Sequence, residues 1–579
     1  MSCTSAPIPM PASICCSPRP TAPSMSFTTS PLTAPRRRSR CRRIGSTPSR
    51  ATTSTASSSA SPVDRTTTAQ VHKRGRKHTQ QRRKRSRNAS TRAWAQAHTT
   101  TAQVQPQRKH TSVGASAHNN GASTTATQAP KGKEPFMKYT LMQHAKLPDQ
   151  EKKQFLPRDI LMAHDEKSGE GRIVAIRQAL SESECSSLTG GAPFERFSAG
   201  NRPVLPAFLD THCHLRDPGF TYKEDIESGT RAALFGGYAG VTAMPNTNPV
   251  TDNAQTVRAI LEKARRVGLC RVLPTCAITV GMKSETLVDF EKMAEEGVVA
   301  FTDDGKPVMT AALLYKAMKA CAKKDYLIMS HCEEMSLAAG GAINEGAISR
   351  QLGVGGISNA AESVCVARDI LLAEETGCRL HICHVSTEQS VALIREAKKR
   401  GVRVTAETCP HYVAFTEEAV LYHGVNAKMN PPLRSEKDRQ AIIEGLLDGT
   451  LDCISTDHAP HSKADKGEDL QKSAFGIIGL QTAFPAALTY LCKDERVKMD
   501  LFRLIELFST NPAKILRLDK EGYGVIQEGG RADLTVIDPD SESIITESML
   551  RSRSANTPFI GLTLCGRIEA VCLNGIRRI

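Results

Sequence analysis

The hydrophobic positions of residues 206–455 fall into short apolar runs that alternate with longer amphipathic segments. Eight runs, each typical of a strand buried on both faces, span 207–210, 240–244, 271–277, 298–302, 326–330, 379–383, 402–406 and 452–455. Apolar residues three and four apart predict helices between them, at 225–235, 253–267, 287–296, 311–323, 360–375, 388–399 and 436–447. This alternation predicts an α/β fold, a (β/α)₈ barrel whose chemistry lies at the C-terminal ends of its strands.

The segments on either side of this region have a different pattern. DILMAHD and GRIVAIRQAL before it, and ADLTVIDPD and RIEAVCLNGIRRI after it, predict short strands. Two β-rich ends can pair into one small domain. We therefore expect four parts: an N-terminal extension at 1–136, one half of a small β domain at 137–205, the barrel at 206–515, and the other half of the β domain at 516–579.

The net charge of +16 is concentrated in the extension. Residues 1–136 hold 23 Lys and Arg against two acids, whereas the remainder holds 53 against 58. A stretch dominated by Ser, Thr, Ala, Pro, Gln and Arg buries too little apolar surface to offset its ordering entropy, so we expect it to be disordered. It is a transit peptide, a nucleic-acid-binding tail, or translated upstream sequence with Met137 as the working start; we favour the last.

The cysteines and the hydropathy bear on the compartment. Fourteen of the 18 cysteines follow residue 136, in a chain too large to need disulfide bonds, which predicts reduced thiols and a cytoplasmic location. The sequence contains no apolar run of the roughly 18 residues that a membrane-spanning helix needs. We therefore expect no membrane association.

The first predicted strand runs directly into a His-x-His motif, in PAFLDTHCHLRDPG. His212 and His214 are two residues apart, so they project from the same face of the strand and can aim at one divalent metal ion. Arg216 shares their parity and can hold an anionic group. A histidine pair alone is more often structural than metal-binding, so the other strand ends decide.

Five further strands end in polar side chains suited to a metal or its substrate. These are Asn246 in AMPNTNP, Asp303 and Asp304 in FTDDG, His331 in SHCEE, His384 in HICHVS, and Asp457, His458 and His461 in STDHAPH. Each motif alone has a structural interpretation, but their convergence on one face of a barrel predicts a metal centre, with two ions. His381 has the opposite parity to His384, so we expect it to be structural.

Seven motifs, occurring in order, resemble the class I (bacterial-type) dihydroorotases of the amidohydrolase superfamily: DTHCHLRDPG, AMPNTNP, FTDDG, SHCEE, HICHVS, KMNPPLR and STDHAPH. The resemblance covers residues 137–579 and implies the same barrel beside a small β domain. The implied activity is the reversible, zinc-dependent cyclisation of N-carbamoyl-L-aspartate to (S)-dihydroorotate and water, a step of de novo pyrimidine (UMP) biosynthesis.

The resemblance also implies roles for individual residues. Two zinc ions are implied per subunit, with His212, His214 and Asp457 on one, His331 and His384 on the other, and Asp304 bridging them. Asp457 is the implied catalytic residue, and the implied substrate contacts are His214, Arg216, Asn246, Asn430, His461, Phe475 and Gly476. Hydantoinases, allantoinases and animal-type dihydroorotases usually bridge with a carbamylated lysine. Lys306, the only lysine nearby, is expected to lie in a turn.

Three other functions remain open at this point. The chain could be a different cyclic amidohydrolase acting on hydantoin or allantoin, a non-catalytic homologue that partners aspartate transcarbamoylase, or a nucleic-acid-binding protein acting through its extension. Arg216 and Asn246 favour an acidic substrate, and the full set of ligand residues argues against a silent homologue. We expect a small-molecule substrate and a homo-oligomer, with association with aspartate transcarbamoylase allowed and no nucleic-acid partner.

Overall fold

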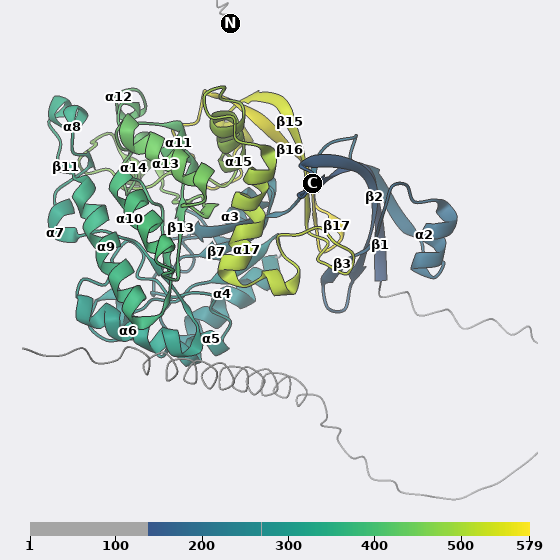
Figure 1. Cartoon of the computed structure of the whole chain (residues 1–579), viewed down its shortest axis with the longest axis horizontal. Coiled ribbons are helices and arrows are strands. Elements are labelled where there is room, and N and C mark those ends of the chain that lie inside the picture. The colour runs from purple at the N-terminus through teal and green to yellow at the C-terminus, as the bar shows by residue number, and fades with distance from the viewer. Residues whose placement is uncertain (1–136, 268) are drawn as a thin grey trace, which may run out of the picture. The chain divides into compact units, whose positions relative to one another are not determined.

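The computed structural model of this protein describes residues 137–267 and 269–579, which form a barrel and a small β domain (Figure 1). The extension expected to be disordered, 1–136, lies outside the described residues. The barrel contains parallel strands β6 (Phe208–Cys213), β7 (Tyr238–Ala243), β8 (Arg271–Pro274), β9 (Leu327–Ser330), β12 (Arg379–Ile382), β13 (Val404–Thr408) and β14 (Cys453–Ile454). All six residues of β6 are buried, as expected for a wall covered on both faces.

The fourth barrel position, predicted as a strand at 298–302, is more irregular than expected. It is reduced to bridges at Phe301, which lies parallel to Cys276 on one side and to Ile328 on the other. A parallel bridge between Cys213 and His458 joins the last strand to the first. The ring is therefore closed, and the predicted (β/α)₈ fold class is confirmed.

Helices follow the barrel strands and cover their outer face (Figure 1). They are α3 (Ile226–Phe235), α4 (Ala254–Val267), α5 (Phe290–Glu295), α6 (Ala311–Lys324), α9 (Asn359–Thr376), α10 (Glu388–Lys399), α13 (Glu436–Asp448), α15 (Ala483–Ala487), α16 (Leu501–Ile505) and α17 (Asn511–Leu516). Local sequence sets where they begin: the Asp225 side chain accepts from Ser228 N at 2.8 Å, which caps α3.

Shorter elements lie in the connections after the strands. Between β9 and α9 are α7 (Met335–Ala338), β10 (Ile343–Asn344), α8 (Ala347–Leu352) and β11 (Gly356–Ile357); later come α11 (Pro410–Ala414), α12 (Ala419–His423) and α14 (Lys463–Lys466). The two long connections follow β9 and β13. They supply loop surface at the end of the barrel where the predicted site lies.

Both ends of the described chain contribute to the small β domain. One sheet has the order β3 (Glu170–Arg177), β2 (Gln154–Asp165), β1 (Met137–Asp149), β4 (Phe194–Ser198), and the domain also holds α2 (Glu182–Thr189). The other has the order β17 (Ile576–Arg577), β16 (Thr563–Leu573), β15 (Leu534–Ile544), β5 (Val204–Pro206). The antiparallel β5–β15 pair joins the two ends of the chain, directly before the first barrel strand.

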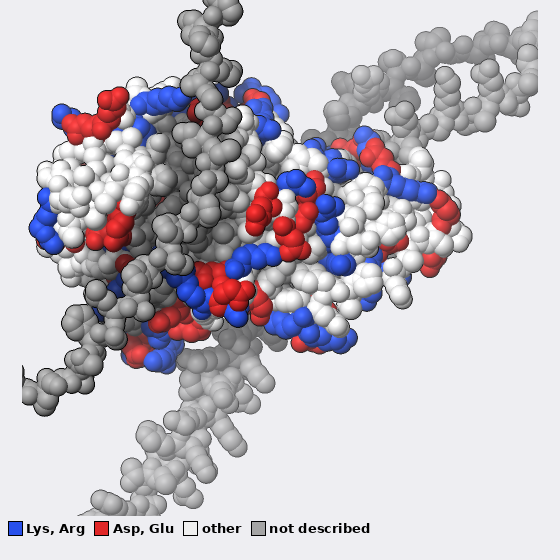
Figure 2. Space-filling view, turned by 90° about the horizontal axis from the view of Figure 1, so that it is seen from above, with Lys and Arg blue, Asp and Glu red and all other residues white. Residues whose placement is uncertain are grey.

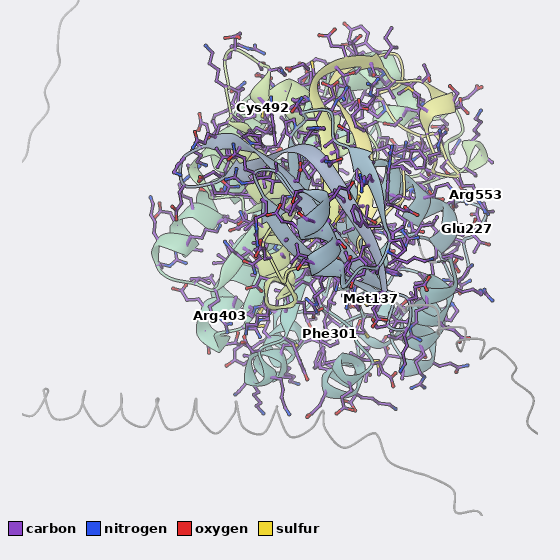
Figure 3. The ribbon with its side chains drawn as sticks, turned by 90° about the vertical axis from the view of Figure 1, so that its right-hand side faces the viewer. Met137, Glu227, Phe301, Arg403, Cys492 and Arg553 are labelled. Carbon is purple, nitrogen blue, oxygen red and sulfur yellow. The ribbon has the colours of Figure 1, made fainter. Side chains whose placement is uncertain are left out.

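The described surface carries charges of both signs, and its thiols are mostly hidden. On the face shown in Figure 2, Lys and Arg are interspersed with Asp and Glu. Twelve of the 14 cysteines in the described residues are buried; Cys492, labelled in Figure 3, and Cys565 are partly exposed. All 14 are free thiols. Among the described helices, none combines the length and the apolar character that crossing a membrane requires.

Candidate metal centre

The two histidines that end β6 face a carboxylate from the fourth barrel position. His212 Nε2 lies 3.4 Å from Asp304 Oδ1, and His214 Nε2 lies 3.5 Å from Asp304 Oδ2. Asp457, which follows β14, adds a second carboxylate, with its Oδ1 3.2 Å from His214 Nε2 and 3.7 Å from His212 Nε2. All four side chains are buried, so the closed ring brings the first, fourth and eighth strand ends together.

The histidines after β9 and β12 approach the other side of the same carboxylate. His331 Nδ1 lies 3.6 Å from Asp304 Oδ1, and His384 Nε2 lies 3.7 Å from it. The two imidazoles are 2.9 Å apart at these nitrogens. Asp304 therefore belongs to two groups whose ligand atoms converge, one with the histidines of β6 and one with His331 and His384.

The donor set suits divalent metal ions. His212 Nε2 and Asp304 Oδ1 are buried and have no hydrogen-bond partner among the described residues, although they face each other across the ring. Leaving buried polar atoms unpaired costs about 1–3 kcal/mol each, which a coordinated cation offsets. Burial opposes ionisation of Asp304, but the nearby His212 holds the pKa of that carboxyl well below its ordinary value. The carboxylate is therefore charged at neutral pH.

Three residues of the site have a left-handed backbone. The φ angles of Arg216, His384 and Asp457 are 58°, 35° and 43°, in a region where residues with a side chain are disfavoured. Each such residue costs roughly 1–3 kcal/mol, and such costs concentrate at functional sites. The strain accompanies the inward placement of a charged or candidate ligand side chain at three strand ends.

The predicted carboxylate-binding residues lie beside the ring. Arg216 Nη2 is 3.2 Å from His461 Nε2, and Arg216 Nε donates to the Pro460 carbonyl at 3.2 Å. Among the described residues, no carboxylate forms an ion pair with Arg216. Burial, followed by the positive charge of Arg216, lowers the pKa of His461 to about 3, so His461 is neutral at pH 7. A partly buried guanidinium without a carboxylate favours an anionic ligand.

Asn246 and Asn430 are each connected by hydrogen bonds to the candidate ligand residues. Asn246 Oδ1 is 2.9 Å from His214 Nδ1, and its Nδ2 donates to Asp304 Oδ2 at 3.3 Å. Asn430 Nδ2 donates to Glu333 Oε1 at 3.0 Å, and Glu333 Oε2 lies 3.2 Å from His331 Nε2. Sequence reasoning missed Glu333, although it occupies the SHCEE motif two residues after His331.

Phe475 and Gly476 lie in a loop that two lysines anchor. Lys466 Nζ donates to the carbonyls of Lys428, Ala474 and Gly476 at 3.1, 2.8 and 3.1 Å. Lys428 Nζ lies 4.3 Å from the centroid of the Phe475 ring. Gly476 has a φ of 126°, and a Cβ there would lie 2.6 Å from the nearest neighbouring side chain. The backbone at Gly476 therefore requires glycine.

Glu407 is the second carboxylate that sequence reasoning missed. It lies on β13 and is fully buried, with Oε1 3.0 Å from His212 Nδ1 and Oε2 3.0 Å from His381 Nε2. His381, expected to be structural, hydrogen-bonds to Glu407 and Thr405 rather than to the ring. The available signal was position, because Glu407 directly follows the strand predicted at 402–406, where no functional side chain was expected. Lys306, the nearby lysine that could have bridged two metal ions in place of Asp304, lies in a turn, where its backbone N–H donates to the Asp303 carbonyl.

Acidification is expected to destabilise the protein partly through His411 in α11. Burial lowers the pKa of His411 to about 4, whereas an unfolded histidine titrates near 6.5. Between those values the unfolded state binds more protons, so stability falls as pH falls. At pH 5 the loss from this residue is about 2 kcal/mol. Urea unfolding at pH 7 and pH 5 should show a smaller drop for His411→Asn, and equal drops in both proteins would contradict this assignment.

The chain is similar in sequence to known proteins. Residues 201–390 match the family model described as dihydro-orotase-like. A dihydroorotase from Staphylococcus epidermidis is 48% identical over 400 residues, 69% of this chain and 92% of its own length. One from Desulforapulum autotrophicum is 48% identical over 372 residues, covering 64% and 86%, and one from Listeria monocytogenes is 45% identical over 372 residues, covering 64% and 86%.

Solved structures agree on the fold. An L-hydantoinase (dihydropyrimidinase) from Arthrobacter aurescens superposes with a TM-score of 0.64 at 24% identity, covering 76% of this chain and 95% of its own. A dihydropyrimidinase from Brevibacillus agri gives a TM-score of 0.63 at 20% identity, covering 76% and 94%. At these identities the likeness shows a shared fold and nothing about the substrate.

Proposed function

The chain belongs to the dihydroorotases, and from this premise we propose that its barrel binds two zinc ions and interconverts N-carbamoyl-L-aspartate and (S)-dihydroorotate at the residues described above. Dihydroorotases hydrolyse a cyclic amide in one direction and close it in the other. The observation that carries the proposal is the ring of four histidines around Asp304, with the carboxylate-free Arg216 beside it.

In the proposed assignment, His212, His214 and Asp457 would hold one zinc ion, His331 and His384 would hold the other, and Asp304 would serve both. Bound zinc would supply a water acidified to near-neutral pKa and polarisation of the carbonyl that reacts. Burial raises the pKa of the nearby Cys383 thiol to about 12. Histidine and carboxylate donors are the usual set for catalytic zinc.

Asp457 handles the proton in this proposal. Its Oδ1 lies against His214, which leaves Oδ2 to accept a proton from the attacking water and deliver it to ring nitrogen N3 as the N3–C4 amide bond breaks. In the cyclising direction Asp457 takes a proton from the ureido nitrogen and returns it to the oxygen that leaves as water.

Arg216, Asn246 and His461 bind the α-carboxylate, which takes no part in ring closure. Fixing the α-carboxylate leaves the β-carboxyl group facing the ureido nitrogen. Ring closure therefore occurs through the β-carboxyl group and gives dihydroorotate. His461 can approach an anion-binding arginine without charge repulsion because it is neutral at pH 7. In this proposal Asn430, Phe475 and Gly476 contact the pyrimidine ring of the substrate.

Replacing Arg216 with methionine is expected to weaken substrate binding more than turnover. Loss of a charged hydrogen bond of about 1.5–3 kcal/mol corresponds to roughly a 10- to 100-fold rise in KM. Dihydrouracil, which lacks the carboxylate, provides the control, because the variant and the parent should process it equally. A KM for dihydroorotate that is the same in both proteins removes Arg216 from the site.

The proposed function is tested with protein that starts at Met137. Its conversion of carbamoyl-aspartate to dihydroorotate, and the reverse, are assayed together with zinc per chain and with hydantoin as the competing substrate. Activity on hydantoin alone, or no activity with two zinc ions bound, would overturn it. The only tryptophan, Trp94, precedes Met137, so the absence of tryptophan fluorescence verifies the start.

We also propose that the chain forms a homo-oligomer and that it can associate with aspartate transcarbamoylase. The structure leaves some apolar side chains exposed, among them Leu371 at 61% and Tyr422 at 83% exposure. Light scattering measures the first, and co-elution with purified aspartate transcarbamoylase measures the second. The nucleic-acid alternative depends on residues 1–136, because residues 137–579 carry a net charge of −5, from 53 Lys and Arg against 58 Asp and Glu.

A further inference from the structure

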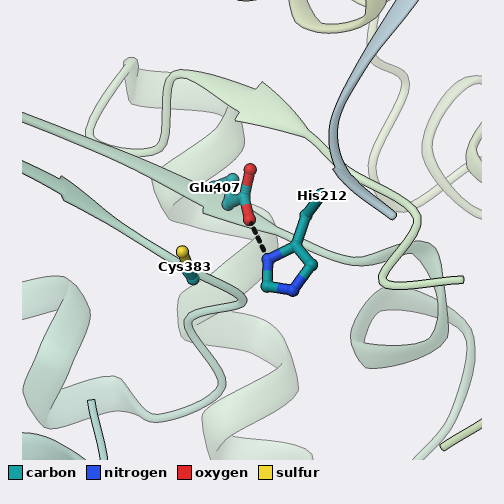
Figure 4. A group of neighbouring side chains, drawn as sticks. All are labelled: His212, Cys383 and Glu407. Atoms are coloured by element: carbon teal, nitrogen blue, oxygen red, sulfur yellow. Dashed lines mark hydrogen bonds and ion pairs between the residues drawn. The ribbon is translucent and has the colours of Figure 1, made fainter. Parts of the chain in front are cut away.

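Glu407 is a buried carboxylate that contacts His212 of the candidate metal centre, on the side of the imidazole away from Asp304. It lies on β13, within the barrel wall, and its side chain is wholly inaccessible to solvent. Figure 4 shows its carboxylate pointing at the imidazole of His212, with Cys383 on the neighbouring strand. The contact runs from Glu407 Oε1 to His212 Nδ1 at 3.0 Å, on the edge of the ring opposite the atom that faces Asp304.

The other oxygen of Glu407 is also fully engaged. Its Oε2 lies 3.0 Å from His381 Nε2, and the Thr211 hydroxyl donates to the same oxygen. His381 Nδ1 is in turn 2.8 Å from the Thr405 hydroxyl. Every contact of this carboxylate is with a side chain of the wall, so Glu407 has no free position toward a substrate.

This geometry determines which nitrogen of His212 carries the proton. A carboxylate can only accept, so His212 Nδ1 must carry the hydrogen that it donates to Glu407. His212 Nε2 is then left with its lone pair aimed into the ring, 3.4 Å from Asp304 Oδ1. The same hydrogen bond fixes the rotation of the imidazole about its Cβ–Cγ bond, because Nδ1 must point at Oε1.

The other ring histidines are held differently. His214 is bound through Nδ1 to the amide of Asn246, and His331 through Nε2 to Glu333, which also binds Asn430. Both partners therefore connect to predicted substrate contacts. His384 Nδ1 is buried and has no partner among the described residues. Glu407 is thus the carboxylate dedicated to orienting a ligand.

We propose that Glu407 is a positioning residue for the metal centre, which fixes the tautomer and ring orientation of His212 and so sets the affinity of the ion that His212 binds. The inference rests on the proposed metal centre and adds to it a determinant of metal retention outside the ligand ring. Partners of this kind change metal affinity by about 10- to 100-fold when they are removed. His381 and Thr211 hold the carboxylate in place.

The test is metal binding by Glu407→Gln in the full chain, by competition with a chromogenic zinc chelator. We expect one of the two zinc ions to bind about 10- to 100-fold more weakly and the other to keep its affinity. Cobalt substitution supplies a spectroscopic readout, since the visible absorption of one ion should change. Glu407→Asp, which keeps the charge but retracts it by one methylene, should show the same selective loss if the glutamine variant folds poorly.

Thr405→Val is the matched control. It removes the 2.8 Å contact at the far end of the same buried chain and should reduce stability while leaving both zinc affinities unchanged. Unchanged zinc affinities in folded Glu407→Gln would overturn the inference, as would equal metal loss in Thr405→Val. A parent protein that fails to bind two ions would instead refute the proposed metal centre, so the two failures are distinguishable.

Discussion

Replacement of Asp304 by alanine is expected to abolish dihydroorotase activity and to lower the zinc content of the protein. Asp304 is the one side chain within 3.4 to 3.7 Å of all four ring histidines in the described residues. Without it, four imidazoles and Asp457 would have to hold two dications with less negative charge between them. A loss of about 4 kcal/mol in transition-state stabilisation corresponds to about a 10³-fold decrease in kcat, and we expect at least that.

The adjacent acid provides the control for this experiment. Asp303 has the same charge and burial, but it accepts from the backbone N–H groups of Ile278 and Thr279 at 2.7 and 3.1 Å, away from the ring. Asp303→Asn should therefore reduce the free energy of unfolding while keeping two zinc ions. The two measurements that decide the role of Asp304 are the zinc content per chain, by atomic absorption, and kcat. Full zinc content and activity in Asp304→Ala would refute the bridging role.

Asp457→Asn is expected to have the other large effect. The amide oxygen can still contact a metal ion, but the side chain can no longer accept a proton. Loss of a general acid–base group lowers turnover by about 10²- to 10⁴-fold. We therefore expect kcat to collapse while zinc content falls less than in Asp304→Ala, and dihydroorotate binding measured by calorimetry to stay within about tenfold of the parent.

The comparison of these two variants separates ligand from proton carrier. If Asp457→Asn loses metal as completely as Asp304→Ala, Asp457 acts as a ligand and its part in proton transfer is untested by activity alone. In that outcome the loss of turnover supports the metal-binding role of Asp457 and not its proton-transfer role. Turnover within tenfold of the parent would reject both roles.

The barrel was predictable because its parallel strands are buried on both faces, which leaves short apolar runs in the sequence. Prediction was least accurate where a strand is held by few bonds. The run at 298–302 is apolar, yet its regular pairing is reduced to Phe301. The sequence between β9 and α9 has no sustained hydrophobic periodicity, so the short elements α7, β10, α8 and β11 could not be predicted from it.

The convergence of most of the candidate ligand residues was also predictable, because they directly follow strands and a closed barrel places strand ends together. Glu407 and Glu333 were missed for a physical reason. Each acts on another side chain rather than on a metal or substrate, and the identity of its partner depends on contacts between strands far apart in the sequence. Glu407 and His212 are 195 residues apart. Spacing within one motif carries no information about such a pair.

The buried cysteine thiols can be used as probes of how the barrel opens. Cys213, Cys383, Cys409 and Cys453 lie at the first, sixth, seventh and eighth strand positions, and none is more than 2% exposed. A disulfide reagent can reach each of them only when its strand separates from its neighbours. Labelling rates followed by mass spectrometry therefore convert into opening free energies, strand by strand. The unaltered polypeptide therefore carries its own reporters of local opening around the candidate metal centre.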